Sequence, residues 1–206
     1  MAKPPDVLLL WPNLVCYVRA LLGAASLGLA WAEASPVVVA VIYVIAMSLD
    51  FLDGYLARRL NETSAYGAAL DVLVDVAQRG GMWILSLGLF GLPVVYLEMV
   101  CFACNHASQG QAWKESFGDA PWLVAAIMAN GFKSFWGALT VAGLHFLPLY
   151  LWLAPRTGSC IGLFLVLFLG RFLGIVAELW MIKRHVGRLL CQDAVSLTER
   201  REVKQS

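Results

Sequence analysis

The chain has 206 residues, of which 60% are hydrophobic and only 14% are charged. Soluble domains average about 25% charged residues, so this composition excludes an ordinary water-soluble globular protein. The formal net charge of +1 and the lack of a basic stripe with interleaved aromatic residues argue against a nucleic-acid partner. The five cysteines are odd in number and scattered, so neither a disulfide framework nor a zinc site is indicated.

Six apolar stretches follow one another, each close to the roughly 20 residues that a helix needs to cross a bilayer. The expected spans are residues 12–31, 36–57, 67–89, 92–112, 132–154 and 159–182. An apolar run that begins at Trp122 is expected to lead into the fifth span. We therefore predict an all-α, integral membrane bundle of six transmembrane helices. Residues 1–190 would form its single domain, and residues 191–206 a polar cytoplasmic tail.

Positive charges fall mainly on one side of these predicted spans. With six spans both termini share a side, and that side also holds the loop over residues 58–66. Most lysines and arginines lie there, whereas the opposite loops hold little beyond Arg156. Because cytoplasmic loops are enriched in lysine and arginine, we expect the termini and the 58–66 loop to face the cytoplasm.

Four aspartates lie at the facing ends of the second and third predicted spans. Asp50 and Asp53 are three residues apart, and Asp71 and Asp75 are four apart, so each pair occupies one face of a helix. The short intervening loop predicts that the two helices are antiparallel neighbours with both pairs at one site. Four carboxylates this close to a bilayer would repel one another, and hard divalent cations with oxygen ligands relieve that repulsion. Structural carboxylates at the helix ends are the alternative.

The residues around these aspartates sharpen the pattern. From Asp50 the sequence is D-F-L-D-G-Y-L-A-R, then eight residues, then G-A-A-L-D-V-L-V-D. This segment resembles the signature of the CDP-alcohol phosphotransferase family, D-x2-D-G-x2-A-R-x8-G-x3-D-x3-D, at every fixed position.

The resemblance implies a role for each signature residue. Asp50, Asp53 and Asp71 would hold metal, as two Mg²⁺ or Mn²⁺ ions. Asp75 would also ligate metal and act as the catalytic base that takes the acceptor's hydroxyl proton. The residues expected to bind the CDP-lipid are Gly54, Ala57, Arg58, Ser64 and Gly67. The two glycines would allow close approach of the nucleotide, and the planar fork of Arg58 suits a phosphate.

The N-terminal stretch W-P-N-L-V-C-Y-V-R, ending at Arg19, resembles the opening of eukaryotic phosphatidylinositol synthases. That resemblance implies phosphatidyl transfer from CDP-diacylglycerol to myo-inositol, which yields phosphatidylinositol and CMP. It also implies a multi-pass protein of the endoplasmic reticulum whose active site faces the cytoplasm, and it is compatible with a homodimer. Arg19 lies inside a span, where a lone cation is costly, so it would snorkel or meet a phosphate.

The acceptor half departs from the synthase pattern. Val76 stands where these synthases usually have arginine, and the nearest arginine is Arg79, one turn on. The fourth and fifth spans carry altered polar residues around positions 105–109 and 133–136. The residues expected to contact phosphate or acceptor are Arg19, Asn105, His106, Gln109 and Lys133. Arg171 and Glu178, seven residues apart, are expected to be structural partners.

Three other functions remain open at this point. Another acceptor, such as glycerol 3-phosphate or an aminoalcohol, would keep the same enzyme class. A non-catalytic paralogue that binds CDP-lipid is compatible with the altered acceptor half. An ion transporter that uses membrane carboxylates is disfavoured, because the acids cluster at one depth with glycines and Arg58.

Overall fold

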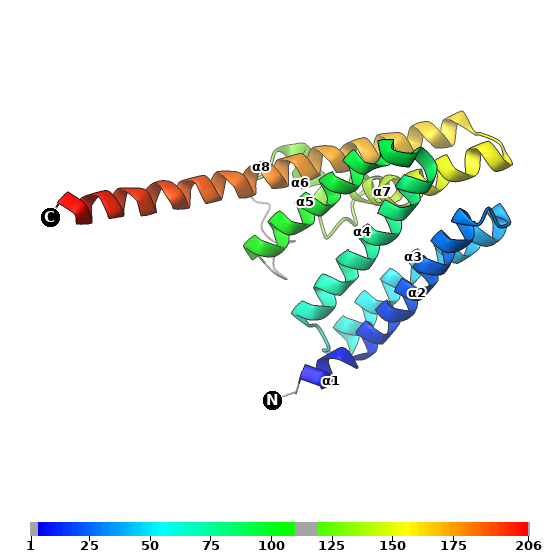
Figure 1. The fold of residues 1–206 in the computed structure, drawn as a ribbon, viewed down its shortest axis with the longest axis horizontal. Helices are drawn as coiled ribbons and strands as arrows, with labels where there is room; N and C mark the ends of the chain where they lie inside the picture. Colours follow the sequence, from blue (N-terminus) through cyan, green and yellow to red (C-terminus); the bar gives the residue numbers. More distant parts are fainter. Residues whose placement is uncertain (1–3, 110–118, 206) are drawn as a thin grey trace.

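The computed structural model describes residues 4–109 and 119–205, and this part of the chain is helical or in turns, with no strand (Figure 1). The elements in chain order are α1 Pro4–Leu8, α2 Trp11–Trp31, α3 Pro36–Arg59, α4 Ala65–Leu87, the 3₁₀ helix η1 Gly88–Gly91, α5 Leu92–Gln109, α6 Trp122–Met128, α7 Phe135–Thr157 and α8 Ile161–Gln205. The expected all-α class is therefore confirmed.

The helix starts follow familiar local chemistry. Pro12 and Pro36 lie at the first positions of α2 and α3, where the missing N–H of proline costs no helical hydrogen bond. The Ser64 and Ser134 hydroxyls cap α4 and α7, and each accepts a hydrogen bond of 2.9 Å from the backbone N–H three residues on. These caps fix where the two helices begin, close to the predicted boundaries.

Five stretches among the described residues are long and apolar enough to cross a membrane. They are Trp11–Trp31, Pro36–Arg59, Ala65–Asn105, Phe135–Thr157 and Ile161–Thr198. The third comprises α4, η1 and most of α5, and the chain reverses at η1 so that α5 returns beside α4 (Figure 1). Gly88, at φ 60°, ends α4 in the left-handed region that glycine favours. The structure thus supports a multi-pass membrane protein, and the count of six crossings stays a prediction.

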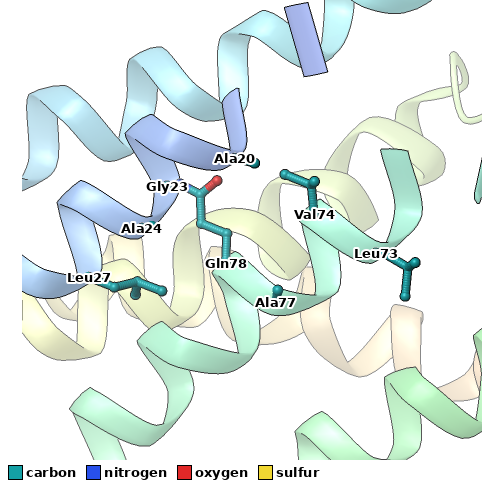
Figure 2. A pocket seen from close by; sticks show the side chains of 8 residues that line it. All are labelled: Ala20, Gly23, Ala24, Leu27, Leu73, Val74, Ala77 and Gln78. Atoms are coloured by element: carbon teal, nitrogen blue, oxygen red, sulfur yellow. The ribbon is translucent and has the colours of Figure 1, made fainter. Parts of the chain in front are cut away.

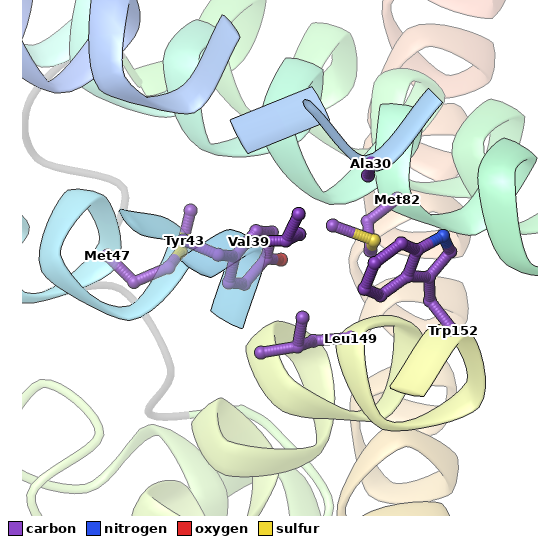
Figure 3. Close-up of a cluster of buried hydrophobic side chains, with 7 residues drawn as sticks. All are labelled: Ala30, Val39, Tyr43, Met47, Met82, Leu149 and Trp152. Carbon is purple, nitrogen blue, oxygen red and sulfur yellow. The ribbon is translucent and has the colours of Figure 1, made fainter. Parts of the chain in front are cut away.

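The helices pack in two connected groups. Helix α2 packs against both α3 and α4, while α8 packs against α7 and α5, and α4 also contacts α5 and α7. One buried apolar cluster joins α2, α3, α4 and α7 (Figure 3). Its members are Ala30, Val39, Tyr43, Met47, Met82, Leu149 and Trp152. Helices α4 and α7 therefore connect the N-terminal group to the C-terminal one.

Two glycines let α7 and α8 cross with their backbones in contact. A Cβ atom at Gly143 would run into the backbone of Gly170 and Arg171, and a Cβ at Gly170 would run into the Leu139 carbonyl. Small residues at such crossings are a common device of membrane helices. The crossing holds the backbone of Arg171, a buried residue, against α7.

Helix α8 runs unbroken from Ile161 to Gln205, well past residue 182, where the sixth apolar stretch ends. Its C-terminal half projects beyond the other helices (Figure 1). The predicted tail is therefore helical as far as Gln205. Its separation from residues 1–190 as a distinct unit stays a prediction.

Candidate functional site

The four signature aspartates converge at the C-terminal end of α3 and in the N-terminal half of α4. These helices are antiparallel, as expected (Figure 1). Their backbones approach each other closely at few positions, because α2 packs against both. Their side chains nevertheless touch, since the Gln78 amide of α4 donates to the Tyr43 carbonyl of α3 at 3.5 Å and Tyr43 shares a buried cluster with Met82.

Arg19 of α2 is completely buried, and its guanidinium lies among the four carboxylates. Nη1 lies 3.0 Å from Asp50 Oδ1, 2.8 Å from Asp53 Oδ2 and 2.7 Å from Asp71 Oδ1. Nη2 contacts Asp75 Oδ1. Arg19 therefore neither snorkels nor stays unpaired, since one guanidinium joins both aspartate pairs.

The same carboxylates offer a set of metal ligands. One oxygen from each of Asp50, Asp53 and Asp71 lies within 4.8 Å of the others. All the donors are carboxylate oxygens, which suit Mg²⁺ and Mn²⁺. The Asp50 and Asp71 side chains remain 32% and 34% exposed, so they are open to a ligand. The arrangement fits a hard divalent cation, and Arg19 bonds to the oxygens that such a cation would use.

Asp75 has a second set of partners. Its Oδ2 lies 2.9 Å from Arg79 Nη1 and 3.9 Å from His145 Nε2 of α7. The other side of Arg79 is held by Glu98 of α5, with Arg79 Nε 3.0 Å from Glu98 Oε2. Asp75 therefore faces Arg19 with one oxygen and the α5–α7 side of the bundle with the other.

Residues expected to bind the CDP-lipid surround the loop between α3 and α4. Arg58 is exposed, and its guanidinium lies over Gly54, 3.5 Å from where a Cβ would stand. Ser64 caps α4 by accepting from the Gly67 N–H, and its hydroxyl hydrogen remains able to donate. A Cβ at Gly67 would meet Asn13 Oδ1 at 2.6 Å, so α2 rather than open space covers this glycine.

Ala57, the remaining CDP-lipid position, is half-buried on α3 between Gly54 and the helix end. Neighbouring Arg59 is exposed and bonds to the Tyr55 hydroxyl one turn back. Arg58 therefore lies against Gly54, whereas Arg59 lies against Tyr55.

The residues expected to contact the acceptor do not all lie together, unlike the aspartates. The Asn105 amide donates to the Cys101 carbonyl at 2.8 Å and to Met181 Sδ at 3.4 Å, so it faces α8. Lys133 is exposed in the turn between α6 and α7. The side chains of His106 and Gln109 lie outside the described residues.

Sequence reasoning missed two charged or titratable residues near Asp75, namely Glu98 and His145. Both are ionisable residues within apolar stretches, and that placement is the signal that could have identified them. Arg171 and Glu178 pair at 3.0 Å, as expected, and Arg171 also lies 3.6 Å from Glu98. The polar residues of α5, α7 and α8 are therefore connected to Asp75.

A groove of about 240 Å³ lies between α2 and α4, beside this site (Figure 2). It is lined mainly by small and aliphatic side chains, namely Ala20, Gly23, Ala24, Leu27, Leu73, Val74, Ala77 and Gln78. Ala20 directly follows Arg19 and Val74 directly precedes Asp75, so the groove begins next to the charged cluster. The Gln78 side chain points toward Gly23 in Figure 2, and its Oε1 has no hydrogen-bond partner among the described residues.

The chain matches known proteins over most of its length. The family model for CDP-alcohol phosphatidyltransferase matches residues 9–186. A CDP-diacylglycerol–inositol 3-phosphatidyltransferase of Arabidopsis thaliana is 28% identical over 95 residues, which cover 46% of this chain and 41% of that protein. The corresponding enzyme of Candida albicans is 39% identical over 70 residues, covering 34% of this chain and 30% of that protein.

A relative with a different acceptor also matches. The CDP-diacylglycerol–glycerol-3-phosphate 3-phosphatidyltransferase of Yersinia enterocolitica is 46% identical over 41 residues, covering 20% of this chain and 22% of that protein. The matches thus span less than half the length of these curated relatives. No solved structure gave a significant match.

Proposed function

Because this chain belongs to the CDP-alcohol phosphatidyltransferase family, we propose that it transfers the phosphatidyl group of CDP-diacylglycerol to myo-inositol, releasing CMP. The observation that carries this proposal is the convergence of four signature aspartates with the buried Arg19. Inositol is favoured as acceptor by the similarity to the plant and yeast inositol transferases.

Asp50, Asp53 and Asp71 would hold two metal ions, Mg²⁺ or Mn²⁺, and Asp75 would also contribute a ligand. When bound, such ions neutralise charge on the transferred phosphate and align it with the incoming and leaving oxygens. The four aspartates pair with only two arginines, Arg19 and Arg79, so the site retains negative charge for a cation to offset.

Arg19 would contribute to donor binding. A cation held by Asp50, Asp53 and Asp71 competes with Arg19 for the same oxygens. The guanidinium released from them would bind a phosphate of the donor, for which its fork geometry is suited. Arg58, at the mouth of the site, would hold another donor phosphate, and the Ser64 hydroxyl would donate to the donor from the cap of α4.

Asp75 would act as the base. One of its oxygens takes the proton of the attacking inositol hydroxyl, and the inositol oxygen bonds to the phosphatidyl phosphorus. The bond from that phosphorus to the oxygen of the cytidylyl phosphate breaks, and CMP leaves with the bonding electrons. The proton on Asp75 then passes to solvent.

The α2–α4 groove supports a lipid donor. It begins beside the charged cluster and is lined by apolar side chains, so a donor with its pyrophosphate at the aspartates can extend one hydrocarbon chain along it (Figure 2). We propose that an acyl chain of CDP-diacylglycerol occupies it.

Release of CMP by purified protein, compared across a panel of alcohols with Mg²⁺ present, tests the function. We expect myo-inositol to give the highest kcat/KM, with a weaker preference than in typical phosphatidylinositol synthases. The altered residues of the acceptor half leave fewer matched hydrogen bonds to enforce discrimination. A clear preference for serine, ethanolamine or choline would overturn the inositol assignment.

The match to a glycerol-3-phosphate transferase supports a second candidate acceptor. A preference for glycerol 3-phosphate in the same panel would establish it and retain the donor half of the proposal. Binding of CDP-lipid and metal without release of CMP to any alcohol would instead identify a non-catalytic paralogue.

We further propose that the protein lies in the endoplasmic reticulum membrane with the aspartates facing the cytoplasm. The clustering of lysine and arginine on the side that holds the 58–66 loop supports this orientation. Labelling of single cysteines in that loop by a membrane-impermeant reagent tests it. Labelling in sealed microsomes supports a cytoplasmic loop, and labelling only after permeabilisation contradicts it.

A further inference from the structure

A line of alternating charges leads from Asp75 across three helices. Arg79 Nη1 lies 2.9 Å from Asp75 Oδ2, and Arg79 Nε and Nη2 both lie 3.0 Å from Glu98 Oε2. Arg171 Nη2 of α8 lies 3.6 Å from Glu98 Oε1, and Arg171 Nη1 lies 3.0 Å from Glu178 Oε2. Neither Glu98 nor Arg171 contacts the other three aspartates, so the line reaches the site through Asp75.

Stability alone is a poor explanation for this line. Arg79, Glu98 and Arg171 are only 7%, 5% and 3% exposed, so each has lost most of its contact with solvent. Removing charged groups from solvent costs about as much as their pairing returns, so buried ion pairs are weak evidence for a stabilising role. Moreover, Glu98 Oε1 and Arg171 Nε make no hydrogen bond within the described residues. Incompletely satisfied charged groups inside a membrane bundle point to function instead.

The geometry at Asp75 indicates what the line does. Asp75 Oδ1 contacts Arg19 at the metal side, while Oδ2 is bound to Arg79. Rotating the carboxylate would break both contacts. Arg79 itself is fixed from behind, because two of its nitrogens bond to one oxygen of Glu98. The position of α5, through Glu98, therefore sets the direction in which Asp75 presents its free electron pairs.

We propose that Arg79 and Glu98 are positioning residues that hold the Asp75 carboxylate in its reactive orientation, with Glu98 acting only through Arg79. This inference rests on the proposed function. It assigns a part in turnover to a residue of α5 that lies outside the signature segment 50–75. Arg171 and Glu178 extend the same line and hold Glu98 from the α8 side.

Kinetics with CDP-diacylglycerol and inositol test the proposal. Glu98→Gln keeps the shape of the side chain and removes its charge, and we expect kcat to fall about 10- to 100-fold, as for other supports of an active-site ligand. The KM for the donor should change less than about threefold, which corresponds to about 0.7 kcal/mol. The affinity for Mn²⁺, measured by electron paramagnetic resonance without turnover, should fall by less than kcat does, because only Asp75 among the four expected ligands depends on Glu98. The Asp50, Asp53 and Asp71 oxygens have no contact with Glu98.

A double variant tests whether Glu98 acts through Arg79. If it does, Glu98→Gln combined with Arg79→Met loses no more kcat than Arg79→Met alone, since the connection is already broken. Arg79→Lys, which keeps the charge beside Asp75, should recover part of the loss caused by Arg79→Met. If the fold loss in kcat of the double variant equals the product of the two single losses, Glu98 does not act through Arg79.

Ser86→Ala is the matched structural control. It removes a hydroxyl that contacts the Met82 carbonyl of α4 and lies 3.1 Å from the Pro148 carbonyl of α7, far along α4 from Asp75. We expect it to lower the melting temperature and to change kcat less than about twofold, which corresponds to about 0.4 kcal/mol. If kcat in Glu98→Gln falls only in proportion to the loss of folded protein, as in Ser86→Ala, the positioning role is refuted. A wild-type protein that releases no CMP would refute the proposed function itself, which separates the two failures.

Discussion

The two groups of helices carry their charges in opposite arrangements. Around α2, α3 and α4, four aspartates face Arg19, only Asp75 has a second arginine, Arg79, and two of the carboxylates remain about one-third exposed. From α4 across α5 to α8, Arg79, Glu98, Arg171 and Glu178 alternate in sign and are all less than one-tenth exposed. The first arrangement leaves oxygens and negative charge for ligands, whereas the second largely neutralises itself. The comparison suggests that the aspartate cluster, with its excess negative charge, is where ligands bind and react. The paired charges on the other side would hold the reacting groups in place.

Removal of divalent metal should give the largest effect, because only the first arrangement needs a cation. Addition of EDTA should abolish CMP release, and Mg²⁺ or Mn²⁺ should restore it. Asp53→Asn, which removes the most buried of the candidate ligands, should weaken Mn²⁺ binding in a direct titration. Full turnover in metal-free buffer would show that the aspartates serve another purpose.

Asp75→Asn should lower kcat by about 10²- to 10⁴-fold, the usual contribution of a general base. Binding of CDP-diacylglycerol, followed by calorimetry, should remain measurable, because three carboxylates of the metal set are intact. Asp75 belongs to both charge arrangements, so this variant separates catalysis from donor binding. Near-normal turnover would require the base to lie elsewhere.

Arg19→Met should raise the KM for the CDP-lipid by on the order of 100-fold. A charge-assisted hydrogen bond contributes about 1.5–3 kcal/mol, and complete burial places Arg19 toward the upper end. Mn²⁺ affinity should not fall, because the variant removes a competitor for the carboxylates. Loss of Mn²⁺ binding in a variant that remains folded would mean that Arg19 organises the metal set.

Arg58→Ala should raise the same KM by roughly 10-fold, the lower end of that range, because this side chain is exposed and screened. Arg59→Ala is its natural control, since Arg59 bonds to Tyr55. We expect it to change the KM less than about threefold, as for other exposed pairs worth under 1 kcal/mol. Equal effects from the two arginines would remove the reason for assigning phosphate binding to Arg58 alone.

Ala77→Phe should have the smallest effect, because it narrows the α2–α4 groove without touching the charged residues. We expect the KM for a long-chain donor to rise about fivefold, which corresponds to about 1 kcal/mol. A soluble donor with short acyl chains should be unaffected. Equal effects on both donors would mean that the groove does not hold the chain.

Local patterns in the sequence predicted the aspartate cluster well, and the reason is physical. Spacings of three and four residues place Asp50 with Asp53 and Asp71 with Asp75 on single helix faces, whatever the rest of the chain does. The helix starts at Pro36 and Ser64 follow from equally local chemistry. The packing of α2 against both α3 and α4 could not be predicted from these local patterns.

The partners of Asp75 could not be predicted in the same way. Whether Glu98 meets Arg79, or His145 meets Asp75, depends on how α5 and α7 are rotated against α4. In a membrane bundle apolar residues cover both the lipid-facing and the buried sides of a helix, so the hydrophobic pattern hardly fixes that rotation. Asn105 was expected near the acceptor from its place in the polar motif of the fourth span, yet its amide faces Met181 of α8.

The unbroken course of α8 offers a way to measure how deep the charged line lies. Its 45 residues would extend about 68 Å, more than twice the roughly 30 Å of a bilayer's hydrocarbon core. Cys191 is exposed on the projecting half and lies twenty residues, about 30 Å along one rigid rod, from Arg171. A spin label on Cys191, with the other exposed cysteine removed by Cys160→Ser, would report the position of this part of α8 relative to the membrane. A water-soluble paramagnetic reagent speeds the relaxation of the label according to how accessible the label is from water, which would place Cys191 relative to the membrane surface. The known distance along α8 from Cys191 to Arg171 would then give the depth of Arg171.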